Sequence, residues 1–265
     1  MLKLNVRTAL ITGASAGIGA EFARQLGASG TRLILVARRI ERLEAIAAEL
    51  RERYGAVVDV LQADLSKSRD IEKVEAAVSA AEDLDLLVNN AGFGSGGKFS
   101  RGDIGPSVDM VQVHVVAAVR LTRAALSGMI PRRRGYVINV ASVAAFTPFS
   151  GIMYGSTKAF LVRFSQNLQY ELADTGIRVQ ALCPGMTHTE FHAAMGVDRS
   201  SLPEFIWMSA RDVVRISLKT LRRRKVIRVP GVLNQASAAL MRCPATAAVL
   251  RAVVGSAYFR RRFRV

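Results

Sequence analysis

The sequence predicts an α/β fold in which a parallel sheet of seven strands is covered by helices on both faces. Two patterns lead to this prediction. Short apolar runs alternate with longer stretches whose apolar residues recur at the helical period, as in repeated strand–helix units. Most residues of the short runs are apolar, which is typical of strands that helices cover on both sides. With 265 residues, the chain can bury such a core without disulfides or metals.

The elements follow in chain order. Each strand candidate is a short apolar run that ends in turn-forming or polar residues, and each helix candidate is a longer run of helical period. The candidate strands are Thr8–Thr12, Leu33–Ala37, Val57–Gln62, Leu84–Asn89, Gly135–Val140, Val179–Cys183 and Val226–Val229. The candidate helices are Ile18–Ala28, Ile40–Tyr54, Arg69–Ala81, Val108–Met129, Met153–Thr175, Arg211–Arg224 and Leu233–Tyr258. The linkers are brief, so we expect one domain over residues 1–265. Residues 187–208 follow a strand end and are rich in turn formers, which makes them a candidate substrate lid.

The net charge of +16 is concentrated near the end of the chain. Residues 211–265 hold 14 lysines and arginines against one acid, Asp212, whereas residues 1–210 hold 23 basic and 20 acidic residues. The basic tail lacks a recognisable recognition helix and interleaved stacking aromatics. We therefore expect no specific nucleic-acid partner, and non-specific affinity would show a steep dependence on salt.

The composition also indicates the cellular compartment of the protein. No window approaches 18 uncharged apolar residues, which argues against a membrane-spanning helix. Cys183 and Cys243 are too few for a disulfide framework, and the N-terminal residues run directly into a strand pattern without the apolar region of a signal peptide. We expect a cytoplasmic protein.

A glycine-rich loop joins the first strand to the first helix. Gly13 allows the turn, Gly17 lets the backbone approach a pyrophosphate, and Gly19 lets the helix and strand pack closely. The free N–H groups at the helix start face the anion. The loop predicts a Rossmann-type, doubly wound domain, although the glycines could also serve the turn alone. Its candidate cofactor-binding residues are Gly13, Ser15, Gly17, Ile18 and Gly19.

The end of the second strand predicts which dinucleotide binds. A fold that prefers NAD usually carries an acidic residue there, for the ribose hydroxyls. Here Ala37 stands in that place and Arg38 follows it. A guanidinium can form charge-assisted hydrogen bonds with a 2′-phosphate, so we expect NADP(H). The alternative is that Arg38 and Arg39 only begin a solvated helix face.

A tyrosine and a lysine lie four residues apart on a predicted helix. Tyr154 and Lys158 therefore project from the same helix face and can act on one ligand. A neighbouring ammonium and an oxidised nicotinamide would both stabilise the phenolate, so we expect the pKa of Tyr154 to fall. Ser142, at a strand end, can hold a carbonyl oxygen beside Tyr154. Together these residues predict a device that transfers a proton to or from a carbonyl.

These motifs, in this order and spacing, resemble the short-chain dehydrogenase/reductase family over nearly the whole chain. The matching pieces are the loop from Thr12 to Gly19, Asp64-Leu65, Asn89-Asn90-Ala91-Gly92, Ser142, Tyr154 with Lys158, and Pro184-Gly185 with Thr187. The resemblance implies that Asp64 and Leu65 flank the adenine, and that Asn90, Ala91 and Gly92 line the cofactor. It also implies that Lys158 binds the nicotinamide ribose, and that Pro184, Gly185 and Thr187 border the nicotinamide. Ser142, Tyr154 and Lys158 would be the catalytic group.

His114 departs from the family pattern. Many members have an asparagine at this place, which holds a water that relays protons to the lysine. A histidine can hydrogen-bond a water, but its longer ring can also displace it. Two interpretations follow: His114 is a catalytic relay that titrates near neutrality, or it is a packed spectator.

The remaining polar candidates predict no metal site. His188 and His192 have an i,i+4 spacing with Glu190 between them, but no third ligand stands out. Cys183 precedes a proline at a strand end, which favours a buried small hydrophobe over a nucleophile.

The substrate is predicted to be hydrophobic, because apolar residues follow the catalytic motifs and fill the candidate lid. They are Phe93, Phe146, Phe149, Phe191, Phe205, Ile206, Trp207 and Met208. The alternative is that these side chains only pack the lid against the sheet. The C-terminal third also resembles actinobacterial NADPH-dependent reductases that include ones acting on β-keto lipid precursors.

The C-terminal residues 233–265 combine apolar residues with clustered arginines. Such a helix can lie on an anionic lipid surface, or it can cover the sheet edge or a partner subunit. The leading functional hypothesis is an NADPH-dependent reductase of a hydrophobic carbonyl, in a chain that forms a homo-oligomer and contacts the inner face of the membrane peripherally. The alternative is a nucleotide-binding sensor that has lost the chemistry.

Overall fold

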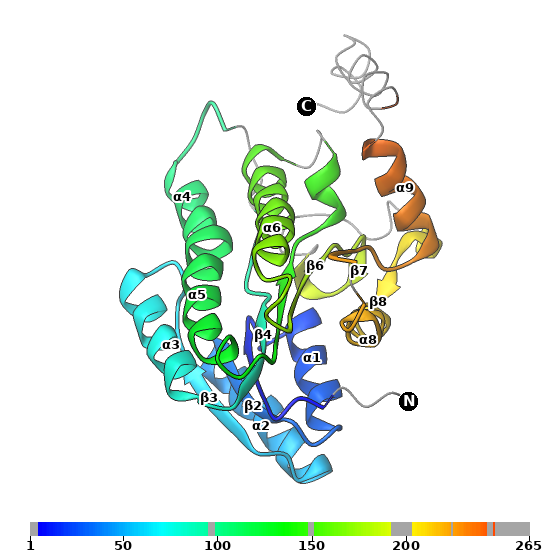
Figure 1. Ribbon diagram of the computed structural model, residues 1–265. Coiled ribbons are helices and arrows are strands. Elements are labelled where there is room, and N and C mark those ends of the chain that lie inside the picture. The colour runs from blue at the N-terminus through cyan, green and yellow to red at the C-terminus, as the bar shows by residue number, and fades with distance from the viewer. Residues whose placement is uncertain are drawn as a thin grey trace.

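In the computed structural model, seven strands form one parallel sheet in the order β3-β2-β1-β4-β5-β6-β9 (Figure 1). The structure describes residues 5–94, 99–147, 151–191, 203–223, 225–242 and 246. Within these residues the sheet confirms the predicted doubly wound α/β fold. No helix in the described part of the chain is both long enough and apolar enough to cross a bilayer.

The strands lie close to their predicted positions. They are β1 (Thr8–Thr12), β2 (Arg32–Ala37), β3 (Val58–Gln62), β4 (Leu84–Asn89), β5 (Gly135–Val140), β6 (Ile177–Leu182) and β9 (Ile227–Arg228). Two further short strands, β7 (Thr187–His188) and β8 (Met208–Ser209), pair with each other in a small second sheet. The small sheet joins the two ends of the predicted lid, whose residues 192–202 lie outside the described residues.

The helices connect the strands and close the fold. They are α1 (Gly17–Gly27), α2 (Ile40–Tyr54), α3 (Ser68–Ala80), α4 (Gly105–Val111), η1 (Gln112–Val116), α5 (Ala117–Met129), η2 (Val143–Phe146), α6 (Ile152–Glu171), η4 (Glu204–Ile206), α8 (Ala210–Thr220) and α9 (Val232–Arg242). The helix predicted over Leu233–Tyr258 corresponds to α9, and its remainder lies outside the described residues except Thr246.

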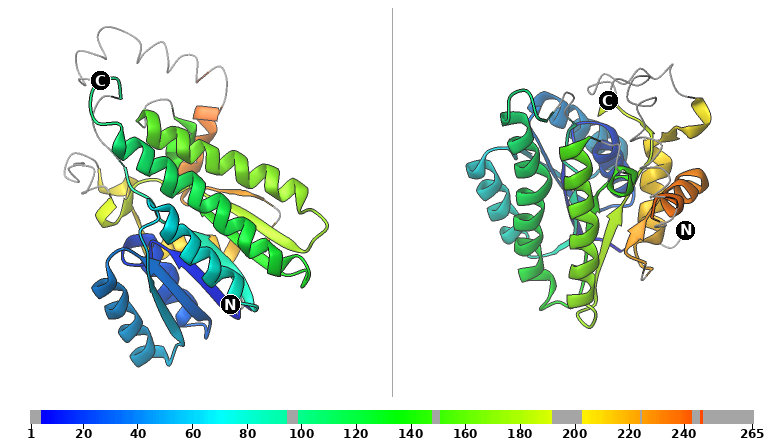
Figure 2. Two further views of the ribbon diagram at one scale, coloured as in Figure 1. Left: turned by 90° about the vertical axis from the view of Figure 1, so that its left-hand side faces the viewer. Right: turned by 90° about the horizontal axis from the view of Figure 1, so that it is seen from above.

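Helices cover both faces of the sheet (Figures 1 and 2), and a layer of buried apolar side chains lies between the sheet and each set of helices. On one face, α1, α2 and α8 bury side chains such as Phe22, Leu43 and Val213. On the other face, α3, α5 and α6 cover the sheet with side chains such as Val74 and Leu121. The central strands β1 and β4 are buried along their whole length, because both layers cover them. Their apolar sequences therefore follow from their position in the sheet.

The predicted helix over Val108–Met129 is interrupted. The segment η1 is a π-helical turn between α4 and α5, and it carries His114. A π-turn inserts an extra residue into the helix and often marks a functional site. Here His114 lies in this turn and points into the protein interior, and only 1% of its surface is exposed to solvent.

The sheet order also places the site. The chain leaves β1 toward β2 and returns to β4 on the other side of β1, so the order reverses between β1 and β4. Ligands of open α/β sheets bind outside the carboxyl ends of the strands at such a switch point. The glycine loop follows β1 and the residues Asn90 to Gly92 follow β4, so both predicted motifs meet there.

Candidate active site

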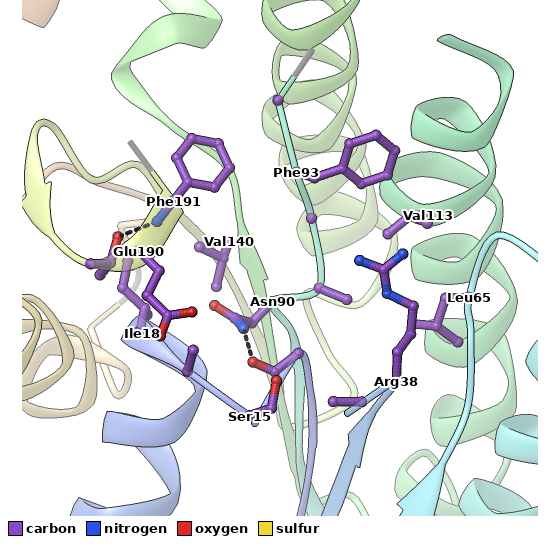
Figure 3. A pocket seen from close by; sticks show the side chains of 18 of the residues that line it. Ser15, Ile18, Arg38, Leu65, Asn90, Phe93, Val113, Val140, Glu190 and Phe191 are labelled. Carbon is purple, nitrogen blue, oxygen red and sulfur yellow. Dashed lines mark hydrogen bonds between the residues drawn. The ribbon is translucent and has the colours of Figure 1, made fainter. Parts of the chain in front are cut away.

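A cleft of about 570 Å³ lies at the carboxyl ends of the strands (Figure 3). Almost all of the predicted site residues line it. They are Gly13, Ser15, Gly17, Ile18, Arg38, Asp64, Leu65, Asn90, Ala91, Gly92, Ser142, Tyr154, Lys158, Pro184, Gly185 and Thr187. Gly19 and His114 do not line the cleft. The structure therefore brings the predicted nucleotide end and the predicted chemical end into one cleft.

The glycine loop can be formed only by small residues. Gly13 has φ +66°, and a Cβ there would lie 2.8 Å from the Cα of Ala91. A Cβ on Gly19 would lie 2.3 Å from the carbonyl oxygen of Gly13, so Gly19 lets α1 begin directly against the loop. No described side chain caps the N-terminus of α1, which leaves its first N–H groups for an anion. The loop therefore fits a pyrophosphate.

Two polar side chains tie the loop to the end of β4. The hydroxyl of Thr12 accepts hydrogen bonds from the N–H groups of Asn90 and Ala91, at 3.0 Å each. The side-chain amide of Asn90 donates to the carbonyl oxygens of Thr12 and Gly13, at 2.9 and 3.1 Å. Asn90 thus supports the loop in addition to lining the cleft. The residue pattern alone does not predict this role of Thr12.

The two arginines after β2 have different environments. The side chain of Arg38 lies on the side of Leu65 and Val113 (Figure 3), and it makes no hydrogen bond or ion pair with the described residues. Arg39 instead contacts Ser15 and Glu190. Arg38 is therefore available to an anionic ligand, as the sequence predicts, and it need not break an existing ion pair.

The helix α6 presents the tyrosine and the lysine to the cleft. The chain turns into α6 at Gly151, which has φ +76°. Lys158 is buried, and its Nζ donates to the carbonyl oxygen of Val140 at 2.8 Å and lies 5.7 Å from the centroid of the Tyr154 ring. Ser142 accepts a hydrogen bond from the N–H of Ala144 at 3.1 Å, which fixes its hydroxyl at the end of β5.

Burial dominates the proton affinities of this group. It raises the pKa of Tyr154 to about 12, with the hydrogen bond to Ser142 opposing the rise. It lowers the pKa of Lys158 from 10.5 to about 8. The sequence predicts the opposite direction for the tyrosine, because a pattern of residues does not give the depth of burial. In the protein alone, Tyr154 is a neutral phenol near pH 7.

His114 is held on both sides of its ring. The N–H of Phe93 donates to Nε2 at 3.1 Å, so that nitrogen carries no proton. The proton is then on Nδ1, which lies 2.9 Å from the hydroxyl of Thr157, and that hydroxyl donates to the carbonyl oxygen of Tyr154 at 3.1 Å. Burial and the charge of Lys158 lower the pKa of His114 well below its ordinary value. The interpretation of a histidine that titrates near neutrality does not fit these contacts.

The predicted apolar enclosure is only partly present. Phe93 and Phe191 line the cleft, and the Phe191 ring centroid lies 5.5 Å from that of Tyr154. Phe205 is 73% exposed, and Trp207 stacks on His188. Phe146 packs in the layer beside β6 and β9 with Arg242 over its ring, Ile206 and Met208 do not line the cleft, and Phe149 lies outside the described residues.

The residues considered as metal ligands have other partners. Nε2 of His188 lies 3.0 Å from a carboxylate oxygen of Glu204, and Glu190 contacts Arg39 and Arg42. No group of three potential ligands comes together within the described residues, and His192 lies outside them. Cys183 is fully buried, and burial raises the pKa of its thiol to about 12, so the thiol is protonated near pH 7.

Several residues of the site were not found from the sequence. Val140 contributes a backbone carbonyl, which no side-chain pattern reveals. Thr157 lies inside the Tyr154–Lys158 motif, and its polarity could have drawn attention to it. Thr189 and Glu190 also line the cleft, and Glu190 was considered only as a metal ligand.

Comparison with known proteins gives a consistent result. The family model described as short chain dehydrogenase matches residues 7–199. The chain is 33% identical over 246 residues to the NADP-dependent 3-hydroxy acid dehydrogenase of Schizosaccharomyces pombe, which covers 88% of this chain and 93% of that protein.

Solved structures match over a similar length. A short-chain dehydrogenase from Sphingobium yanoikuyae in complex with NADPH is 36% identical with a TM-score of 0.81, and covers 89% of this chain and 95% of its own. The bulky-bulky ketone specific alcohol dehydrogenase from Comamonas testosteroni is 34% identical with a TM-score of 0.78, and covers 89% and 94%.

Proposed function

Because this chain belongs to the short-chain dehydrogenase/reductase family, we propose that it is an NADPH-dependent reductase that converts the carbonyl of a bulky, hydrophobic substrate to an alcohol. The observation that carries this proposal is the common cleft. Ser142, Tyr154 and Lys158 line the same cleft as the glycine loop and Arg38. A dinucleotide that spans the cleft would bring its reactive ring to the tyrosine.

The chain's own residues hold the cofactor in this proposal. Backbone N–H groups at the start of α1 receive the pyrophosphate, and Arg38 binds the 2′-phosphate. Asp64 and Leu65 border the adenine, Pro184, Gly185 and Thr187 border the nicotinamide, and Lys158 binds the nicotinamide ribose. When bound, NADPH supplies the hydride. The NADP dependence of the S. pombe relative and the NADPH in the S. yanoikuyae structure support this choice of cofactor.

Tyr154 acts as the proton donor. A reductase needs a protonated acid beside the carbonyl oxygen, and burial keeps the phenol neutral, with a pKa of about 12. Ser142 holds the carbonyl oxygen by a hydrogen bond, so the oxygen lies where the phenol can donate. The ammonium of Lys158, fixed by the carbonyl of Val140, lies over the ring and stabilises the phenolate that forms after proton transfer.

The substrate is proposed to be a bulky ketone or a β-ketoacyl lipid. Phe93 and Phe191 give the cleft apolar walls near Tyr154. The specificity named for the C. testosteroni enzyme, for bulky-bulky ketones, agrees with such walls. Purified protein should oxidise NADPH with ketones, and kcat/KM should rise with apolar chain length. An equal rate with small and large ketones would contradict the substrate class.

A variant of the tyrosine separates chemistry from binding. Tyr154→Phe should lower kcat by about 100- to 10,000-fold, the usual contribution of general acid catalysis, while NADPH affinity stays near that of the wild type. Intrinsic protein fluorescence measures the affinity. Full activity in Tyr154→Phe would exclude this proton donor, and absence of NADPH binding in the wild type would exclude the proposed function.

The surface suggests two further partners. Ile104 just before α4, Val108 on α4 and Ile152 on the neighbouring helix α6 are exposed, which supports association of copies into a homo-oligomer. The helix α9 exposes Val232 and Leu233 and leads into the basic C-terminal residues, which supports peripheral contact with an anionic membrane. Co-sedimentation with anionic vesicles and not with neutral ones is expected, and equal binding to both would contradict the contact.

A further inference from the structure

Three consecutive residues after β7 reach three different parts of the cleft. Thr189 packs on the glycine loop: a Cβ on Gly17 would lie 3.0 Å from its Cγ2. Phe191 lies against the catalytic tyrosine at the other end, and its N–H donates to the hydroxyl of Thr189 at 3.3 Å. Glu190, between them, points toward the first turn of α2. The segment 189–191 therefore crosses the cleft from the pyrophosphate side to the chemical side.

Glu190 is bound by Arg39, which directly precedes α2, and by Arg42 in the first turn of that helix. Its Oε2 accepts from Nη1 of Arg39 at 3.1 Å, and its Oε1 accepts from Nη1 of Arg42. Arg39 also donates to the hydroxyl of Ser15 at 3.3 Å, so the ion pairs connect the segment to the glycine loop. The carboxylate lies beside the N-terminus of α2, where the helix dipole favours negative charge. Figure 3 shows Glu190 beside Ile18 and Phe191, across the cleft from Arg38.

We infer that Glu190 is a positioning residue for the cofactor: it uses Arg39 and Arg42 to hold the segment 189–191 across the cleft, and leaves the 2′-phosphate to Arg38. The inference rests on the proposed function, because it takes a pyridine dinucleotide as the ligand. The set Glu190, Arg39 and Arg42 is called the clasp below.

Charge supports this division between the arginines. Arg38, Arg39 and Arg42 provide three positive charges near the start of α2, and Glu190 and Glu41 provide two negative charges, which leaves a surplus of one positive charge. A 2′-phosphate carries about 1.5 to 2 negative charges near pH 7, as other phosphate monoesters do. The region therefore keeps a positive charge for the phosphate while Glu190 is paired with Arg39 and Arg42.

Space also supports the clasp over a competing arrangement. In the competing arrangement, Glu190 would occupy the place of the 2′-phosphate and would have to leave before NADPH binds. However, the cleft keeps a volume of about 570 Å³ while both ion pairs are formed, and Arg38, on the opposite side, forms no ion pair with any residue that the structure describes. The clasp and a bound dinucleotide can therefore coexist.

The two arrangements predict different effects of Glu190→Gln. A clasp over the cofactor contacts the part of the molecule that NADPH and NADH share. Loss of the clasp should therefore increase the dissociation rates of NADPH and NADH by the same factor. Exposed ion pairs contribute little each, so we expect about a three- to tenfold increase from the two together. A competing carboxylate would give the opposite result: its removal would free Arg39 and increase NADPH affinity selectively.

The experiment measures the dissociation rates of NADPH and NADH separately by stopped-flow fluorescence. The fluorescence of the reduced nicotinamide gives the signal, and an excess of the non-fluorescent oxidised nucleotide prevents rebinding. The matched control is Glu44→Gln on α2, because Glu44 also pairs with an arginine, Arg51, and its side chain is 56% exposed against 57% for Glu190. Arg42→Gln, outside the cleft lining, should give a smaller increase in the same direction. The double variant Glu190→Gln with Arg42→Gln should dissociate no faster than Glu190→Gln alone.

The outcomes separate the clasp from the proposed function. Unchanged dissociation in Glu190→Gln, or an effect equal to that of Glu44→Gln, would overturn the clasp while the reductase remains. Selectively tighter NADPH binding would replace the clasp by competition. Additive effects in the double variant would show that Glu190 and Arg42 act independently and would also overturn it. Failure of the wild type to bind either nucleotide would overturn the proposed function itself.

Discussion

The buried ammonium of Lys158 predicts that replacing this lysine makes the protein more stable. Burial lowers the pKa of Lys158 from 10.5 to about 8. A depressed lysine pKa means that the folded protein disfavours the charged form, so the charge destabilises the fold at any pH below about 8. At pH 7, a difference of this size corresponds to about 3 kcal/mol.

The variant Lys158→Met removes the charge and keeps most of the apolar stem. It also removes the hydrogen bond from Nζ to the carbonyl of Val140, whose loss costs about 1 kcal/mol. We therefore expect Lys158→Met to be more stable than the wild type by about 2 kcal/mol at pH 7, and to lose nearly all reductase activity.

Denaturant unfolding without nucleotide measures this difference, and its pH dependence tests the cause. The wild type should gain stability relative to Lys158→Met as pH rises through about 8, by about 2.5 kcal/mol between pH 7 and pH 10. Ionisation of other groups cancels in the comparison. Lys219→Met on α8 is the control, because Lys219 is exposed. A destabilised Lys158→Met at pH 7, or a difference that does not change with pH, would refute this reasoning.

Three other substitutions test separate parts of the structure. Burial alone would raise the pKa of Asp85, but Arg7 and Arg134 outweigh burial and lower this pKa. The ionised Asp85 therefore stabilises the fold, and this contribution is lost as pH falls below about 4. Asp85→Asn should lower the free energy of unfolding by about 2 kcal/mol in denaturant unfolding and remove this acid sensitivity. His114→Asn should retain or raise kcat, because an amide can also accept from the N–H of Phe93, and a collapse of kcat would show an essential histidine. Arg38→Asp should lower the NADPH-to-NADH ratio of kcat/KM by at least tenfold, and an unchanged ratio would remove Arg38 as the determinant.

The fold was predictable because the central strands carry two separate signals in the sequence. β1 is an apolar run and is also followed by the glycine loop, and β4 is an apolar run followed by Asn90. Edge elements have weaker marks: β3 is half exposed at several positions, and β9 contains only two residues. The break at η1 was not predictable, because an inserted residue in a helix leaves the apolar pattern nearly unchanged over one turn.

The candidate site was predictable where side chains carry it. Gly13, Tyr154 and Lys158 belong to motifs with fixed spacing. The order of strands in the sheet brings these motifs to the same cleft. The contacts that position them were less visible. Lys158 depends on a backbone carbonyl of Val140, and Glu190 meets Arg39 and Arg42 across about 150 positions of sequence. Such pairs form because the segment after β7 approaches the start of α2, which no local pattern encodes.

The directions of the pKa shifts of Tyr154 and Lys158 also depend on tertiary packing and could not be predicted from the sequence. The sequence correctly indicates that Tyr154 and Lys158 share a helix face, and from charge alone the lysine should acidify the tyrosine. Burial acts on both groups at once: it disfavours the phenolate and it disfavours the ammonium. The same burial therefore gives a neutral acid for reduction and a lysine whose charge is easily lost. A spacing of four residues specifies that two groups act together, whereas the depth at which α6 packs against β5 decides their protonation.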